Sequence, residues 1–280
     1  MQEQFSGNGR PHLRERIGTG VLLKLIALVI GVGAGIYLLL GSNRLSAATL
    51  KALQEAQLAD VNAENIQYPS GGDLSIKAFR AEAKAGGKHP GVIIVHSNQG
   101  LDASAQDLAR HFAAEGFVAL APDLLSRPSS AGGGNARTVA ELSAEHTVDD
   151  VKAAFEFLSK DPEVDADKIS AVGLGWGGWR VYRLAEETPK LHRAVIYYGS
   201  TPMSGLENIH TPVLAHYAQY DFRITGNAIW TANTINASGK KFSYYIYPGA
   251  DAAFINKPDE PDDAKATELS WKRTLDFLRS

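Results

Sequence analysis

Short apolar runs and longer stretches of helical spacing alternate along the larger, C-terminal part of the chain. From residue 89 onward the apolar runs are flanked by Gly and Pro, and the segments between them repeat apolar positions at helical spacing. This alternation predicts an α/β fold, with helices covering both faces of a mainly parallel sheet. The expected strands are residues 91–95, 118–121, 169–172, 194–198, 213–217 and 241–247. The expected helices are residues 103–115, 138–159, 179–187, 228–237 and 264–278.

A hairpin precedes this region. Residues 65–68 and 74–81 alternate apolar and polar positions on either side of a turn that reads Pro-Ser-Gly-Gly-Asp. The folded domain therefore begins just before the hairpin, and we expect it to cover residues 61–280. Residues 42–60 have apolar positions at mixed helical spacing, which predicts a helical linker in front of the domain.

The N-terminal part contains an apolar segment of the length that crosses a bilayer. Residues 21–40 are apolar apart from Lys24 and small residues, and twenty helical residues span about 30 Å, the thickness of the hydrocarbon core. Gly31, Gly33 and Gly35 form a small-residue face on which another membrane helix could pack closely. The alternative is that they only reflect the high frequency of glycine in membrane helices.

We predict a transmembrane helix over residues 17–41, with another membrane protein or complex as its partner. Residues 1–16 are polar and more basic than acidic, so the positive-inside rule places this tail in the cytoplasm. The domain over residues 61–280 then lies on the periplasmic or extracellular side. A cleaved signal peptide is the alternative, because residues 46–48 read Ser-Ala-Ala, although its apolar region is usually about 7 to 15 residues long.

Composition excludes several kinds of chemistry. The net charge of −3, from 28 basic and 31 acidic residues, provides no electrostatic footprint for nucleic acid. The chain has no Cys, which excludes disulfides, thiolate metal sites and a Cys nucleophile. His, Asp and Glu do not cluster at the spacings of metal ligands, so we expect no metal and no cofactor.

A glycine-rich turn follows the expected strand at residues 169–172. Residues 172–180 read Val-Gly-Leu-Gly-Trp-Gly-Gly-Trp-Arg, and a helix can begin after them, which is the context of the nucleophile elbow of α/β-hydrolases. The elbow needs Gly on both sides of its central residue because strand and helix approach closely. Gly173 and Gly177 occupy those places, but Gly175 stands where Ser, Cys or Asp should carry the reaction.

Four phrases in the same order resemble the dienelactone hydrolase family of the α/β-hydrolase fold. They are Gly-Val-Ile-Ile-Val-His at residues 91–96, Ala-Ala-Glu-Gly-Phe-Val-Ala-Leu-Ala-Pro-Asp-Leu at 113–124, Val-Gly at 172–173 with Gly-Gly at 177–178, and Tyr-Pro-Gly-Ala with Ala-Phe within 247–254. The resemblance covers nearly all of residues 60–280. It implies an α/β-hydrolase fold, and it does not by itself establish the activity.

The resemblance also implies a catalytic triad of nucleophile, acid and base, and assigns its positions. The nucleophile's place holds Gly175, the acid's place holds Asp221, and the base's place holds Ala252. Gly175 cannot form a covalent intermediate and Ala252 cannot transfer a proton. Asp221 then has no His to orient, and the alternative for it is a turn carboxylate bonded to nearby backbone N–H groups. A Glu that usually follows the strand at 91–95 is replaced by Ser97.

The residues expected around the pocket offer two further hypotheses. His96, with Ser97 next to it, lies where the family forms part of its oxyanion hole, and Asn98 is expected in the same pocket. His96 and His216 are either candidates for a relocated catalytic site or ordinary structural histidines. Trp176 follows the nucleophile position directly, so its ring either fills the substrate space or packs helix against sheet. We therefore expect a membrane-anchored, catalytically inactive binding or scaffold subunit. The alternatives are an ester or lactone hydrolase with a relocated nucleophile, and a small-molecule or lipid carrier.

Overall fold

A computed structural model describes residues 58–84, 86–130, 134–257 and 259–280. The predicted tail, the predicted transmembrane helix with Gly31, Gly33 and Gly35, and nearly all of the predicted linker lie outside these residues. Within the described part of the chain, no helix combines the length and the apolar character needed to cross a membrane.

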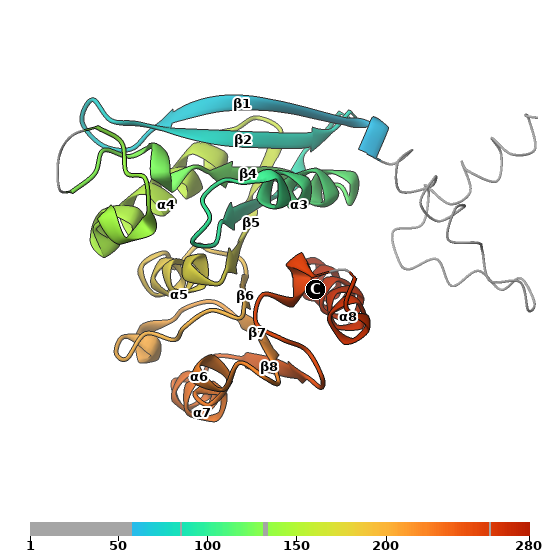
Figure 1. The fold of residues 1–280 in the computed structure, drawn as a ribbon. Helices are drawn as coiled ribbons and strands as arrows, with labels where there is room; N and C mark the ends of the chain where they lie inside the picture. Colours follow the sequence, from blue (N-terminus) through green and yellow to red (C-terminus); the bar gives the residue numbers. More distant parts are fainter. Residues whose placement is uncertain (1–57, 85, 131–133, 258) are drawn as a thin grey trace, which may run out of the picture. The chain divides into compact units, whose positions relative to one another are not determined.

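The domain is built on a sheet whose strands run in the order β1-β2-β4-β3-β5-β6-β7-β8 (Figure 1). The strands are β1 (Val61–Pro69), β2 (Ser75–Ala83), β3 (His89–Val95), β4 (Val118–Pro122), β5 (Val164–Leu174), β6 (Ala194–Tyr197), β7 (Val213–Ala218) and β8 (Phe242–Tyr247). The expected hairpin is confirmed as β1 and β2, which pair antiparallel, and β2 is also antiparallel to β4. All pairs from β4 through β8 are parallel, as the alternation of apolar runs and helices predicts.

Helices cover both faces of the sheet. They are α3 (Ala103–Ala114), α4 (Ala144–Ser159), α5 (Trp176–Glu187), α6 (Phe222–Thr225), α7 (Ala228–Ala237) and α8 (Pro261–Arg279). Successive residues of β3 divide between two cores, because side chains alternate across a strand. Ile93 packs in the core that α4, α5 and α7 share, and Ile94 packs in the core that α3 and α8 share. The continuous apolar runs of the sequence follow from this burial on both faces.

Three helix starts differ from the prediction. The helix expected over residues 264–278 begins at Pro261, because proline suits the first position of a helix. The helix expected over residues 138–159 begins at Ala144, because Ser143 caps it by accepting a hydrogen bond from the His146 N–H at 3.4 Å. The helix expected from residue 179 begins at Trp176, immediately after the Gly175 turn. Glycine is a poor helix former, but a side chain at Gly177 or Gly178 would clash with the backbone of neighbouring segments of the sheet.

The strand ends determine where a site can form. The parallel strands β3, β5, β6, β7 and β8 all end at the same edge of the sheet, so the segments that follow them gather there. In open α/β sheets ligands bind at the carboxyl ends of the strands. Gly175 follows β5, Asp221 follows β7 and Ala252 follows β8, so the fold brings all three predicted triad positions to this edge.

Candidate functional site

The turn between β5 and α5 has the geometry of a nucleophile elbow. Gly175 has φ +51° and ψ −109°, a conformation that side-chain-bearing residues rarely adopt. Its N–H donates to the Tyr197 carbonyl at 2.9 Å, and its own carbonyl accepts from the Gly178 N–H at 3.0 Å. The strand is thereby reversed into the helix within a single residue.

The other glycines of the turn are required by close backbone contacts. A methyl group placed on Gly173 would lie 2.7 Å from the Gly177 carbonyl oxygen, and one on Gly177 would lie 2.2 Å from the Val95 carbonyl oxygen. A methyl group on Gly178 would lie 2.8 Å from the Gly199 Cα. These distances are shorter than van der Waals contact with groups that cannot swing away. The glycines let α5 approach β3 and β6, which is the physical reason the sequence pattern suggested.

Gly175 is different, because the space beside it admits a side chain. A methyl group there would lie 3.8 Å from the Ser97 Cβ and 3.8 Å from the Tyr198 ring, both ordinary contacts. The absence of a side chain at position 175 is therefore not imposed by crowding at these neighbours. Ser97 is where the sequence placed it, beside this position, and its Oγ accepts a 3.4 Å hydrogen bond from the Gln99 N–H. Asn98 is exposed on the same loop.

The loops that carry Asp221 and Ala252 are joined by backbone hydrogen bonds. The Gln219 N–H donates to the Tyr247 carbonyl and the Tyr220 N–H donates to the Ala250 carbonyl, both at 3.1 Å. Asp221 precedes α6, and its backbone carbonyl accepts hydrogen bonds from N–H groups of the first turn of that helix. Among the described residues, the Asp221 carboxylate makes no hydrogen bond. The turn-carboxylate alternative is therefore not what the structure shows. Ala252 is exposed and provides no titratable group.

His96 is buried and both of its ring nitrogens are occupied. Its Nε2 accepts from the Leu124 N–H at 3.1 Å, so the proton resides on Nδ1, which donates to the Ser97 carbonyl at 2.7 Å. Burial lowers the pKa of His96, which keeps the ring neutral. No nitrogen is left to accept a proton from a substrate, so this histidine fixes the loop instead of serving a relocated catalytic site.

The Trp176 ring lies between His96 and Arg180. It stacks on the imidazole with ring centroids 5.7 Å apart and planes 10° apart, and the Arg180 Cζ lies 3.4 Å from its centroid. Arg180 donates to Thr147 Oγ1 and to the Trp176 carbonyl, and burial lowers its pKa to about 10. Within the described part of the chain no carboxylate pairs with this guanidinium. The sequence predicted the position of Trp176 but not this stack.

Tyr198 is a site residue that sequence reasoning missed. It follows β6, has φ +41°, and only 6% of its surface is exposed. The Cδ2 and Cε2 edge of its ring lies against the position of a side chain on Gly175, yet its hydroxyl has no hydrogen-bond partner among the described residues. The only available signal was its location, because the residue after β6 adjoins the elbow after the neighbouring β5.

His216 belongs to a buried network on the other side of the sheet from α5. Its Nδ1 is 2.9 Å from the Tyr247 hydroxyl, and its Nε2 is 3.0 Å from Thr274 Oγ1, which in turn is 2.8 Å from the Tyr197 hydroxyl. Complete burial lowers the pKa of His216 to about 3. It is a structural histidine that ties β7 to β8 and α8.

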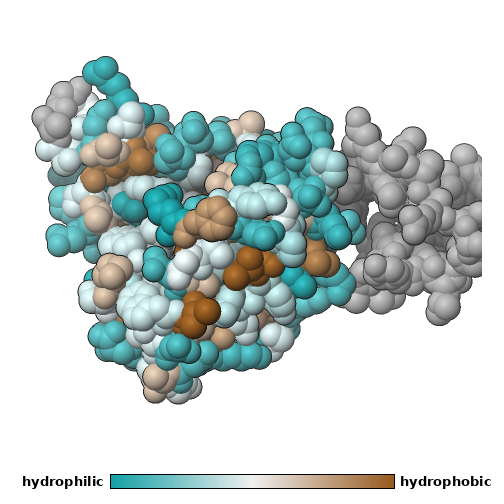
Figure 2. Space-filling model, turned by 60° about the horizontal axis from the view of Figure 1, so that its bottom comes forward, coloured by the Kyte–Doolittle hydropathy of each residue, from teal (hydrophilic) through white to brown (hydrophobic). Residues whose placement is uncertain are grey.

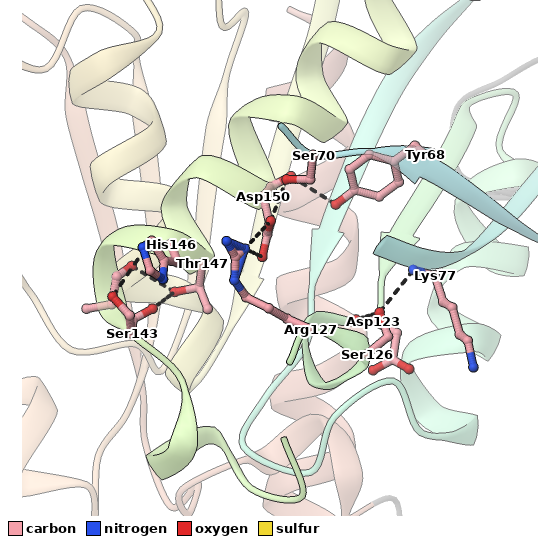
Figure 3. Close-up of polar contacts among 11 residues, drawn as sticks. Tyr68, Ser70, Lys77, Asp123, Ser126, Arg127, Ser143, His146, Thr147 and Asp150 are labelled. Carbon is pink, nitrogen blue, oxygen red and sulfur yellow. Dashed lines mark hydrogen bonds and ion pairs between the residues drawn. The ribbon is translucent and has the colours of Figure 1, made fainter. Parts of the chain in front are cut away.

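A second buried cluster joins the hairpin to α4 (Figure 3). Arg127 Nη1 donates to both carboxylate oxygens of Asp150, at 2.9 and 3.1 Å, and the Ser70 hydroxyl also bonds to this carboxylate. The Tyr68 hydroxyl donates to the Asp150 carbonyl at 2.9 Å. Burial raises the pKa of Asp150. The cluster fixes β1 and the loop after β4, and nothing in the sequence pattern predicted the pairing.

In the α/β-hydrolase fold, one strand of a mainly parallel sheet leads through a glycine-lined elbow into a helix, and the acid and base positions follow later strands. This chain has that arrangement. A sequence model described as the dienelactone hydrolase family matches residues 76–280, which is more than half of the chain. The protein belongs to the dienelactone hydrolase family.

Similar proteins agree with this assignment. A protein of Saccharolobus solfataricus, named as a candidate carboxymethylenebutenolidase, is 28% identical over 258 residues, covering 77% of this chain and 98% of its own. A structure named as a candidate dienelactone hydrolase from Klebsiella pneumoniae has a TM-score of 0.70 at 24% identity, covering 79% of this chain and 99% of that one. A dienelactone hydrolase-like phosphotriesterase from metagenomic libraries has a TM-score of 0.63 at 22% identity, covering 79% and 98%. The two structures support the fold alone.

Proposed function

We propose that this protein is a member of the dienelactone hydrolase family that has lost hydrolysis and acts as a binding or scaffold subunit of a membrane protein complex. It is held at the membrane by residues 17–41, with the α/β domain on the periplasmic or extracellular side. The observation that carries the proposal is an elbow of retained geometry around Gly175, a residue without a nucleophile.

The chemistry of hydrolysis fails at two separate steps. Without a side chain at position 175 no covalent acyl intermediate can form. Without a base at position 252 the proton transfer normally worth about 10²- to 10⁴-fold is lost. His96 and His216 do not compensate, because their ring nitrogens are already engaged within the protein. Asp221 retains its carboxylate, but its usual role is to orient a histidine that this chain does not have at position 252.

Apolar side chains exposed near the same edge support a role in binding. Phe222 is 75% exposed and Ile229 is 66% exposed, on α6 and α7, and Met203 is exposed on the segment after β6. Figure 2 turns the part of the molecule with α6, α7 and β8 forward and shows apolar side chains among polar ones. The helix α7 contains no charged residue. Large exposed apolar side chains on soluble domains mark interaction surfaces when they gather.

The test of the subunit role is extraction of the membrane in mild detergent with an affinity tag after Ser280. We expect the tagged chain to migrate with a large membrane complex, and Gly33→Leu to weaken this association if the helix face makes the contact. Migration as a lone monomer, with no partner recovered after cross-linking, would overturn the subunit role.

The second candidate function is an ester or lactone hydrolase with a relocated nucleophile. It is favoured by the names of the relatives and by Ser97, whose Cβ lies 3.8 Å from where a side chain on Gly175 would begin. A fluorophosphonate probe distinguishes the two. Labelling of the wild type that disappears in Ser97→Ala would establish the serine route, and the absence of labelling in both supports the non-hydrolytic function.

A further inference from the structure

The strand β8 is an open edge of the sheet (Figure 1). It is the last in the strand order, with β7 as its partner strand in the described part of the chain. An edge strand presents unpaired N–H and C=O groups, and proteins usually protect such an edge with charged residues or proline. The opposite edge strand, β1, contains Glu64 and ends at Pro69, whereas β8 reads Phe-Ser-Tyr-Tyr-Ile-Tyr. The β8 edge therefore lacks the usual protection against pairing.

The hydrogen bonds at the two ends of β8 show which of its backbone groups point away from the sheet. The carbonyls of Lys241 and Tyr247 accept from the N–H groups of Val213 and Gln219, at 2.9 and 3.1 Å. These odd-numbered residues therefore face β7. Because successive residues of a strand direct their backbone groups to opposite sides, the even-numbered residues 242, 244 and 246 face outward.

Two residues of β8 keep both of their outward backbone groups open. The N–H of Phe242 donates to Asn236 Oδ1 at 2.9 Å, so it is already used. Pro248, the next residue that would face outward, has no N–H. Tyr244 and Ile246 each have an outward N–H and C=O with no partner among the described residues. The open backbone of the edge is thus centred on these two residues.

A second copy of β8, antiparallel across a twofold axis, matches these open groups. When Tyr244 of one copy lies opposite Ile246 of the other, the two residues exchange both hydrogen bonds, and the axis repeats the exchange. Every open N–H of the edge is then used. Placing Tyr244 opposite its own copy would instead leave the Ile246 carbonyl facing the occupied N–H of Phe242. In the favoured register Tyr245 lies opposite its own copy, with Cα atoms about 4.5 Å apart.

Exposed apolar side chains flank the open edge. Tyr245 is 39% exposed and Ile246 is 43% exposed, on opposite faces of the sheet because side chains alternate along a strand. The helix α7 packs beside β8 and exposes Ile229 and Trp230. A twofold axis between two edge strands is perpendicular to the sheet, so the α7 helices of both copies lie on the same face. Pairing therefore removes apolar surface from water and adds an aromatic cross-strand pair at Tyr245.

The charges at the two ends of β8 favour an antiparallel copy. Lys240 and Lys241 precede the strand and form no ion pair among the described residues. Beyond the other end lie Asp251, which pairs with the exposed Lys257 at 3.0 Å, and Asp221, whose carboxylate makes no hydrogen bond in the described part of the chain. Antiparallel pairing brings the two lysines of one copy beside the carboxylates of the other. Parallel pairing would place like charges together, which is unfavourable.

We propose that this protein forms a twofold dimer in which the β8 strands of two copies pair antiparallel and join their sheets into one. The dimer goes beyond the proposed function and does not depend on the loss of hydrolysis, because β8 contains no residue of the elbow. Each dimer carries two copies of the predicted membrane helix.

Disulfide cross-linking at position 245 tests the register. Since the chain has no Cys, Tyr245→Cys gives each copy a single thiol. Membranes containing this variant are treated with copper phenanthroline, which oxidises two thiols to a disulfide where the Cα atoms lie about 4.4–6.8 Å apart. We expect a band of twice the chain mass on a non-reducing gel, which disappears on reduction. The control is Asn62→Cys, exposed on the opposite edge strand, which should remain a single chain.

Proline at an outward position tests the hydrogen bonds. Ile246→Pro removes one outward N–H from each copy and no bond to β7, and proline is tolerated on an edge strand at such positions. The loss of two hydrogen bonds across the axis should raise the dissociation constant of the dimer at least roughly tenfold. Asn65→Pro is the matched control, because the Asn65 N–H also points away from the sheet, on the β1 edge. Sedimentation of the full chain in detergent, corrected for bound detergent, measures the mass of each variant.

The dimer is overturned if the wild type has the mass of one chain, if Ile246→Pro dimerises as tightly as the wild type, or if Tyr245→Cys cross-links to a different protein or to nothing. A doubled mass that survives in Ile246→Pro and is lost in Gly33→Leu would assign the contact to the membrane helices instead. None of these results bears on the subunit role, which depends on the complex recovered by mild extraction. Ester turnover by the wild type would overturn the non-hydrolytic function and leave the dimer standing.

Discussion

Two alanine substitutions at the elbow should have very different effects on stability. Gly177→Ala places a methyl group 2.2 Å from the Val95 carbonyl oxygen and 2.6 Å from the His96 carbonyl oxygen, so the backbone of α5 or β3 must shift. Gly175→Ala places its methyl group no closer than 3.8 Å to Ser97 or Tyr198, and its only penalty is the positive φ.

The magnitudes follow from these contacts. Holding a residue with a side chain at this φ costs about 1–3 kcal/mol, and the reduced entropy of the unfolded chain offsets about 0.4–1 kcal/mol of it. Gly175→Ala should therefore lower the free energy of unfolding by at most about 2.5 kcal/mol. Gly177→Ala overpacks a contact with backbone that cannot swing away. Overpacking typically costs about 1–3 kcal/mol and more where the backbone must shift, so a loss above about 3 kcal/mol is expected.

Urea unfolding followed by circular dichroism measures both losses, provided that the slope with denaturant is the same for each variant. In a domain of this size each kcal/mol corresponds to about 2–4 °C in Tm, so the two variants should be separable by thermal melting as well. Equal destabilisation by the two substitutions would refute the argument that position 175 is free to carry a side chain. A harmless Gly177→Ala would refute the close approach of α5 to β3.

Two buried groups give further predictions. His216 has a pKa of about 3 in the folded protein against 6.5 ordinarily, so the unfolded chain binds a proton between these values and the folded chain does not. Stability due to neutral His216 is present above pH 6.5 and is lost as pH falls, by about 4–5 kcal/mol at pH 3, so the advantage of wild type over His216→Phe should shrink between pH 7 and 4 in urea titrations. Asp150→Asn leaves the Arg127 guanidinium without its carboxylate and should cost about 3–5 kcal/mol, part of which the double variant Arg127→Leu/Asp150→Leu recovers in the same assay.

The sheet could be predicted because its signal is local. Apolar runs such as residues 91–95 are continuous, since β3 is buried on both faces, and turn residues separate them from the helices. The hairpin could be predicted because its signal is also local: apolar and polar positions alternate on either side of a turn sequence. Helix starts were less predictable, because the beginning of α5 at Trp176 depends on contacts between Gly177 and a strand distant in sequence.

The candidate site likewise has features that the sequence predicts and features that it does not. The positions of Gly175, Asp221 and Ala252 at one edge of the sheet follow from strand order and the family motifs. The unpaired hydroxyl of Tyr198 and the engagement of both nitrogens of His96 do not, because each depends on which groups from other strands lie within 3–4 Å. Sequence spacing carries no information about such contacts unless a motif records them.

The central claim is that the elbow is retained without hydrolysis, and ester turnover tests it most directly. The full chain in mild detergent is incubated with p-nitrophenyl butyrate, beside an Asp221→Ala variant and a protein-free detergent blank. The account predicts that wild type and variant release p-nitrophenol at the same rate as the blank. Release by the wild type above the blank, abolished in Asp221→Ala, would show a working triad acid and contradict the account.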